Sequence, residues 1–273
     1  MHAGVAYGTG VLMDALLQTI ASIGSGVLVG FVLGLIGGGG SILATPLLLY
    51  VVGVAQPHIA IGTGALAVSA NAYANFIAHA RKRNVRWRCA IVFALVGTVG
   101  ALAGSTLGKT LDGQKLLFLF GLVMIAVGLS MLRPRRDHDA AREVTTVRNC
   151  LRTAAAALVA GAASGFFGIG GGFLIVPALM LASGMSMSNA VGSSLLAVGT
   201  FGLATALNYA ASGLVDWKIA GFFILGGIGG GVIGTRLSLK LGGHRNALGR
   251  IFAGIVFAVA LYILYRSASA LFG

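Results

Sequence analysis

Charged side chains are scarce in this sequence, where Asp, Glu, Lys and Arg together make up 9% of the 273 residues. A soluble domain carries about a quarter charged residues. Hydrophobic residues make up 57% of the chain, and long uncharged stretches follow one another along it. Each stretch can cross a hydrocarbon core, which requires roughly 20 apolar residues per helix. The composition predicts an all-α, polytopic transmembrane helical bundle.

Acidic side chains are the scarcest, and all six lie at predicted helix ends, in loops or in the segment that joins the two halves of the chain. Cation pathways and carboxylate proton relays place Asp or Glu inside the helix bundle. The absence of such residues there favours an anionic or neutral cargo. The acidic residues are Asp14, Asp112, Asp137, Asp139, Glu143 and Asp216.

Cysteines and metal-ligand patterns are also sparse. Cys89 and Cys150 both fall beside predicted cytoplasmic loops, where thiols stay reduced, so no disulfide is expected. The five histidines are scattered, without metal-ligand spacing or a nucleophile paired with a base. We therefore expect no metal, no cofactor and no enzymatic activity.

Lys and Arg are absent from the first 80 residues and concentrate in segments 81–88, 133–152 and 236–250. The positive-inside rule places these three segments in the cytoplasm, and therefore predicts a multi-pass membrane protein with both termini outside. A secretory signal peptide begins with a basic segment, so none is indicated. Topology thus accounts for the net charge of +13 without a nucleic-acid partner.

A glycine-rich block that closes with a proline occurs twice. Residues 34–49 read GLIGGGGSILATPLLL, and residues 165–180 read GFFGIGGGFLIVPALM. Further matching segments follow both blocks in the same order, which indicates an internal duplication. The matches are 58–66 with 188–196, 84–87 with 214–217, and 100–104 with 230–234.

The loop charges of the two halves are reversed. The loop around Trp87 is strongly basic, whereas the equivalent loop around Trp217 is not. Conversely, 109–115 is nearly neutral, and its equivalent at 240–250 is basic. Inverted topology explains this reversal. We therefore predict a first repeat over 1–132, a cytoplasmic linker over 133–152 and a second repeat over 153–273.

Hydrophobicity predicts eight to ten segments, depending on how the two shortest are counted. Residues 41–53 and 172–184 are too short to span a bilayer alone, so we expect them to form broken or re-entrant helices. The expected helices are 12–36, 41–53, 59–79, 89–110 and 115–132 in the first half, and 153–168, 172–184, 189–211, 217–240 and 247–267 in the second.

The glycine runs are candidate anion sites. No Gly-Lys-Ser/Thr follows either run, so they do not form a nucleotide loop. Helices that restart after them would expose unpaired N–H groups, and glycine lets an anion approach the backbone. The alternative is that the glycines only permit close helix crossing. The candidate substrate-binding residues here are Gly38, Gly39, Gly40, Ser41, Gly170, Gly171 and Gly172.

Other intramembrane polar residues have two interpretations each. The hydroxyls of Thr63, Ser193 and Ser194 either donate to a substrate oxyanion or bond to helix carbonyls. His79 either couples protons or is an interfacial histidine without function. Arg236 either attracts anions at a cytoplasmic vestibule or extends to the interface as a membrane-anchoring side chain. The side chains of Asn71, Asn75 and Asn208 either join helices or contact the ligand, and helix joining is favoured. The glycine stripes 100/104/108 and 226/230/234 are expected to be packing faces.

The paired Gly-rich blocks ending in proline, the small and hydroxyl-bearing segment after each, and the two Val-x-Trp loops resemble the TauE/SafE sulfite-exporter family of membrane permeases. The resemblance covers nearly the whole chain. It implies a transporter of the bacterial inner membrane, typically an exporter, of sulfur-containing anions such as sulfite or organosulfonates. The first block reads Gly37-Gly-Gly-Gly-Ser41 and the second Gly168-Ile-Gly-Gly-Gly172, so the two turns need not be equivalent.

The resulting hypothesis is a secondary transporter that binds a small anion between inverted repeats and works by alternating access. An anion channel, a membrane-embedded enzyme acting on lipid or peptide, and a non-transporting subunit of a larger complex are the alternatives. The expected partners are the anionic substrate and the lipid bilayer, and the sequence leaves open whether the chain forms a homo-oligomer.

Overall fold

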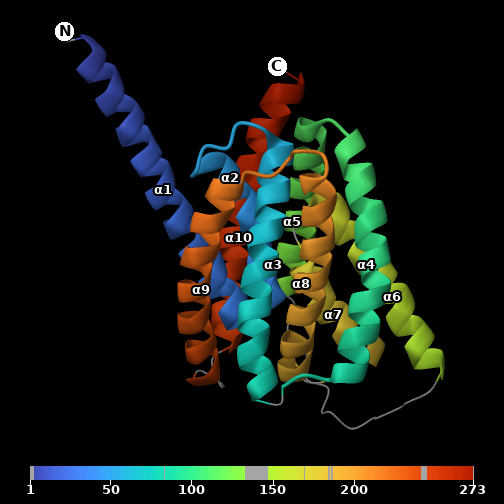
Figure 1. The fold of residues 1–273 in the computed structure, drawn as a ribbon. Coiled ribbons are helices and arrows are strands. Elements are labelled where there is room, and N and C mark those ends of the chain that lie inside the picture. Colours follow the sequence, from blue (N-terminus) through green and yellow to red (C-terminus); the bar gives the residue numbers. More distant parts are fainter. Residues whose placement is uncertain are drawn as a thin grey trace.

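A computed structural model describes residues 3–82, 84–132, 147–168, 170–183, 185, 187–240 and 245–272. All regular elements in these residues are helices (Figure 1). The first half comprises α1 (Ala3–Ile36), the 3₁₀ helix η1 (Gly38–Leu43), α2 (Ala44–Tyr50), α3 (Pro57–Arg81), α4 (Trp87–Thr110) and α5 (Gly113–Leu132). The second comprises α6 (Val147–Phe167), α7 (Gly172–Ser183), α8 (Met187–Ala210), α9 (Trp217–Lys240) and α10 (Arg245–Phe272).

These elements confirm the predicted helical bundle. Four apolar spans are long enough to cross a membrane, namely Ala15–Leu35, Trp87–Thr110, Asn189–Ala210 and Trp217–Ser238. The expected segment 41–53 is divided, because η1 precedes α2, and Pro46 lies in the first turn of α2, where its missing N–H is not needed. Most of the expected linker lies outside the described residues, so its conformation stays a prediction.

The helix pairing follows the internal repeat. Helix α1 packs on α9, and α4 packs on α6, so exchanging the two halves turns one pair into the other. Helix α3 packs on its counterpart α8, and α5 on its counterpart α10. Figure 1 shows α3 running away from the end where both termini lie, whereas α8 runs toward it. The bundle is therefore built from two interlocked, inverted repeats.

The glycine stripes form the closest helix contacts. A Cβ atom on Gly226, Gly230 or Gly234 of α9 would overlap a backbone carbonyl oxygen of α1. The equivalent stripe on α4, at Gly100 and Gly104, meets backbone carbonyls of α6 in the same way. Such close approach strengthens dispersion contacts in a medium where apolar side chains gain nothing from association. The prediction that these stripes are packing faces is confirmed.

Charge is excluded from the interior that the structure describes. The buried polar side chains there are Ser, Thr, Asn and one histidine, without Lys, Arg, Asp or Glu. Large apolar side chains face outward instead, as with Leu95 on α4 (67% exposed) and Tyr265 on α10 (75% exposed). This distribution is the one expected of helices whose solvent is lipid.

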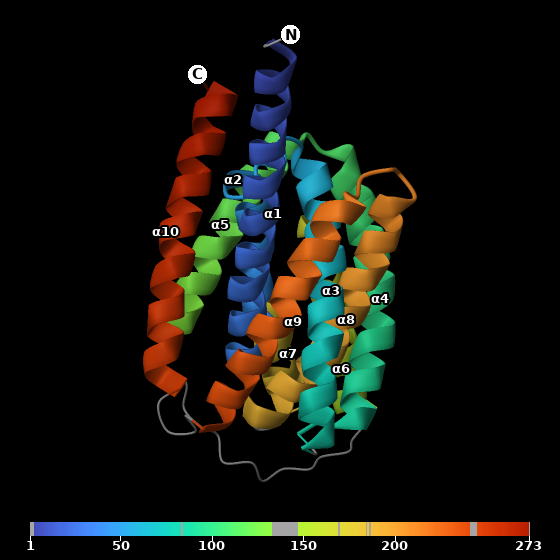
Figure 2. The ribbon, with the colours of Figure 1, turned by 60° about the vertical axis from the view of Figure 1, so that its left-hand side comes forward.

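The connections with basic sequences gather at one end of the bundle. The α3–α4 loop, the end of α5, the start of α6, the end of α9 and the start of α10 all lie opposite the two termini (Figures 1 and 2). The termini share the other end, and α1 extends beyond the remaining helices there.

Candidate substrate-binding site

The second glycine-rich turn connects α6 to α7. Gly168, Gly170 and Gly171 have φ angles of 66°, 68° and 64°, a left-handed conformation that side chains disfavour. The Gly171 carbonyl accepts hydrogen bonds from the N–H groups of Leu174 (2.9 Å) and Ile175 (3.0 Å), which closes the first turn of α7. The preceding N–H groups, on Gly172 and Phe173, have no acceptor within the helix. This turn therefore presents backbone donors at a helix N-terminus, as the sequence predicted.

The turn lies against the middle of the central helix pair. A Cβ on Gly170 would lie 3.1 Å from Val68 of α3 and 3.2 Å from Val198 of α8. These two valines are equivalent positions of the two repeats, and each is completely buried near the centre of its helix. The N-terminus of α7 is thus placed deep in the bundle, where the two halves meet.

Ser164 of α6 faces this turn. A Cβ on Gly171 would lie 2.8 Å from the Ser164 Oγ atom, so only glycine leaves room beside that hydroxyl. Ser164 is 1% exposed, and its Oγ has no hydrogen-bond partner among the residues that the structure describes. Ser164 was not among the candidates from sequence. It immediately precedes the repeated block, and its counterpart in the first half is Leu33, so repeat comparison alone gave no reason to select it.

The first glycine-rich turn is built differently. Gly37 has a φ of 83°, but the chain continues as the six-residue 3₁₀ helix η1, which contains Gly38, Gly39 and Gly40. A Cβ on Gly40 would overlap the backbone of Leu33, and Ser41 is completely buried. The α-helix begins only at Ala44. The two turns are therefore not equivalent, which agrees with the difference between their sequences.

Thr63 and Ser193 form the same contact in opposite halves. Thr63 Oγ1 accepts a hydrogen bond from the N–H of Asp216 (2.9 Å), just before α9, and Ser193 Oγ accepts one from the N–H of Arg86 (3.0 Å), just before α4. Ser194 Oγ donates to the Val191 carbonyl within its own helix (2.8 Å). Ser194 thus bonds to a helix carbonyl, as in the structural alternative, whereas Thr63 and Ser193 accept from backbone N–H groups of the opposite repeat. Their role in substrate binding stays a prediction.

Two of the three asparagines join helices as expected. Asn75 Nδ2 donates to the Asn71 carbonyl (2.9 Å), and Asn75 Oδ1 accepts from Thr235 of α9 (3.0 Å). Asn208 of α8 donates to Ser105 of α4 (2.6 Å). Asn71 differs, because it is completely buried and neither atom of its amide has a partner within the described part of the chain. Helix joining does not explain this side chain.

The two titratable candidates lie in different environments. His79 is 3% exposed and lies in the last turn of α3, so both interpretations of its role stay predictions. Gly192 of α8 lies beside it, where a Cβ would be 3.5 Å from the His79 Cβ atom. Arg236 is exposed on α9. This position is compatible with attraction of anions and with anchoring at the membrane interface, so its role stays a prediction.

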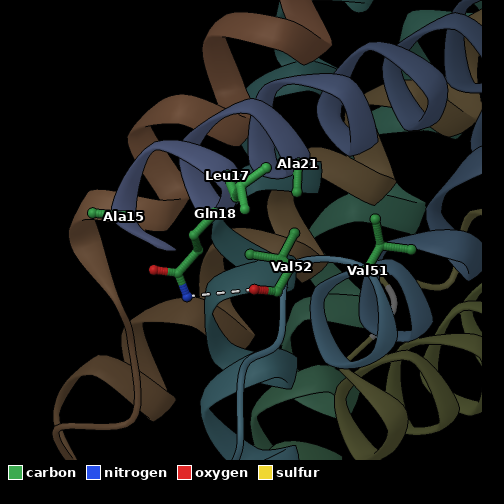
Figure 3. Close-up of a pocket in the computed structure, with 6 residues that line it drawn as sticks. All are labelled: Ala15, Leu17, Gln18, Ala21, Val51 and Val52. Atoms are coloured by element: carbon green, nitrogen blue, oxygen red, sulfur yellow. Dashed lines mark hydrogen bonds between the residues drawn. The ribbon is translucent and has the colours of Figure 1, made fainter. Parts of the chain in front are cut away.

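A pocket of about 550 Å³ lies outside the candidate site (Figure 3). It is bordered by α1 and the end of the α2 segment, where Gln18 Nε2 donates to the Val52 carbonyl (3.4 Å). The glycine turns do not contribute to it. Its lining residues are Ala15, Leu17, Gln18, Ala21, Val51 and Val52.

Two inverted helical repeats, interrupted helices at their junction and an uncharged interior define a membrane transport protein. A model of the sulfite exporter TauE/SafE family matches residues 22–263. The chain belongs to this family and is a membrane transporter.

Relatives named "Probable membrane transporter protein" occur in several bacteria. One from Xylella fastidiosa is 63% identical over 253 residues, covering 92% of this chain and 97% of the relative. YunE from Bacillus subtilis is 28% identical over 237 residues, covering 79% and 87%. One from Haemophilus influenzae is 25% identical over 196 residues, covering 69% and 72%. No solved structure matches the chain.

Proposed function

We propose that this protein is a secondary transporter that exports small sulfur-containing oxyanions, such as sulfite or organosulfonates, by alternating access. The observation that carries the proposal is the glycine turn that begins α7, where Gly170 lies against Val68 and Val198 at the junction of the repeats. Substrate sites of inverted-repeat transporters are built at such junctions from the N-termini of interrupted helices.

The charge of the interior supports an anionic cargo. A helix N-terminus carries about half a positive charge and favours anions over cations. No carboxylate is buried in the described residues, so a cation entering there would meet no opposite charge. A neutral substrate would gain less than an anion from the same backbone donors. Export as the direction of transport rests on the family alone.

Alternating access is supported by polar contacts at opposite ends of the bundle. Near the end that carries the termini, Lys109 Nζ of α4 donates to Asn208 Oδ1 of α8 (2.8 Å). Toward the other end, Thr235 of α9 bonds to Asn75 of α3 (3.0 Å). Each contact joins one repeat to the other. Rocking of the repeats would separate one contact while the other stays closed.

We propose that the protein lies in the bacterial inner membrane, with the basic end of the bundle on the cytoplasmic side. Lys82 is exposed in a loop at the basic end, and Ala211 is exposed in a loop at the end with the termini. Each is a suitable position for a single introduced cysteine. In a variant without Cys89 and Cys150, a membrane-impermeant maleimide added to intact cells is expected to label Ala211→Cys alone. Labelling of Lys82→Cys alone would reverse the orientation.

The transport proposal is tested with purified protein in liposomes. Vesicles preloaded with unlabelled sulfite are expected to accumulate external radiolabelled sulfite, because a carrier exchanges substrate across the membrane. The same assay with methanesulfonate tests an organosulfonate. Saturable counterflow distinguishes a carrier from a channel, which shows none. Folded protein that moves neither anion would refute the proposal.

A further inference from the structure

The asymmetry between the two glycine turns limits where an anion binds. Only α7 restarts as a full α-helix of 12 residues, whereas the first half restarts as the short helix η1. Ser164 lies beside the α7 turn, and the equivalent position beside the first turn is the apolar Leu33. The hydroxyl of Ser164 therefore has no counterpart at the symmetry-related position beside the first turn.

The Ser164 hydroxyl is an unused donor at this position. It is buried, and it has no partner in the described residues although it lies against Gly171. Buried hydroxyls are normally hydrogen-bonded, and an exception requires an explanation such as an absent ligand. The hydroxyl lies near the end of α6, and the N–H groups at the start of α7, which have no acceptor within that helix, lie across the same turn. A bound oxyanion would satisfy both.

The surroundings also limit the charge of that ligand. The walls that Gly170 touches are Val68 and Val198, and no cationic side chain is buried among the described residues. Transfer of an ion from water into a low-dielectric site costs free energy that rises with the square of its charge. A dianion therefore costs about four times as much as a monoanion, while a helix terminus offers only about half a positive charge.

From these observations we propose that the α7 turn and the Ser164 hydroxyl form a single anion-binding position that accepts singly charged oxyanions and rejects dianions. Ser164 Oγ donates to one ligand oxygen, and the backbone N–H groups at the start of α7 donate to the others. Hydrogensulfite and alkylsulfonates have the required charge, whereas sulfate does not. The inference rests on the transport function proposed above and specifies the ligand of that site.

The first test measures charge selectivity with the unmodified protein. Excess unlabelled methanesulfonate is expected to inhibit counterflow of labelled methanesulfonate, and a 100-fold higher concentration of sulfate is expected to leave it unchanged. Equal inhibition by the two anions would overturn the charge assignment. Because this experiment uses no variant, its result does not depend on the folding of a mutant.

The second test removes the hydroxyl. Loss of a hydrogen bond to a charged group is expected to raise the KM of Ser164→Ala for methanesulfonate by about 10- to 100-fold. Ser25→Ala is the matched control, because Ser25 of α1 is also buried and its hydroxyl also lacks a partner in the described chain, but α1 carries no such turn beside it. The control is expected to keep the wild-type KM.

Stabilisation by ligand gives a readout independent of transport. Methanesulfonate is expected to raise the melting temperature of the wild type and of Ser25→Ala, and not that of Ser164→Ala. A wild-type KM in Ser164→Ala would overturn the assignment of Ser164 alone. Absence of any anion flux in the wild type would instead overturn the transport function on which the inference rests.

Discussion

Alanine at Gly230 is expected to destabilise the protein severely, whereas alanine at the adjacent Gly229 is expected to leave its stability unchanged. A Cβ on Gly230 would overlap the Val27 carbonyl of α1, so two backbones would have to separate. A Cβ on Gly229 would meet nothing within 4 Å. Overpacking of a core typically costs about 1–3 kcal/mol, and displacement of two backbones falls at the upper end of that range.

The measurement is the melting temperature of the detergent-solubilised protein, followed by the loss of its monodisperse chromatographic peak on heating. Gly104→Ala provides an independent repetition, because a Cβ there would overlap the Ala162 carbonyl in the equivalent α4–α6 contact. Equal melting temperatures for Gly229→Ala and Gly230→Ala would show that α1 and α9 do not approach as closely as described.

Most of the architecture could be predicted because it depends on composition along the chain. The uncharged stretches predicted the α-helices to within a few residues for most elements, and the loop charges predicted the inversion. Glycines at four-residue intervals predicted the faces on which α4 and α9 pack. Each of these patterns depends on residues close together in the chain or on their interaction with the bilayer, and not on contacts between distant residues. A single sequence therefore shows them.

The parts that sequence could not provide depend on partners distant in the chain. Whether Thr63 faces a ligand or the backbone of Asp216 is decided by a contact between two repeats. The sequence also did not show that His79 is buried, because its burial depends on a neighbour in α8, Gly192. Ser164 was missed because its significance comes from Gly171, a neighbour only after the turn has formed.

Departures from the internal symmetry are the most informative features that the sequence does contain. Asn71 of α3 corresponds to Phe201 of α8. Phe201 stacks on Phe93 of α4, in the first repeat, with ring centroids 6.1 Å apart, and both side chains are completely buried. Asn71 instead places an amide against Gly227 of α9, where a Cβ would overlap it. One repeat has thus exchanged an aromatic contact for a buried polar group.

Asn71→Leu is therefore expected to stabilise the protein and to reduce transport by at least about tenfold. A buried polar group without a partner costs about 1–3 kcal/mol, and an apolar side chain of similar size removes that cost. Retention of a destabilising group indicates a function, because natural proteins depart from optimal packing mainly at functional sites. The amide is available to the substrate, or to a partner in the opposite conformation of the transporter.

Asn75→Leu is the matched control, and its stability is expected to change in the opposite direction. Asn75 lies one turn along α3 and is also buried, but its amide donates to the Asn71 carbonyl and accepts from Thr235. Removal of that amide leaves the Thr235 hydroxyl without its acceptor, which is expected to lower the melting temperature. Measured together with counterflow, the two variants separate packing from function. If Asn71→Leu is more stable and transports at the wild-type rate, the buried amide has no role in transport. The asparagine at this position would then be a packing defect that the protein tolerates.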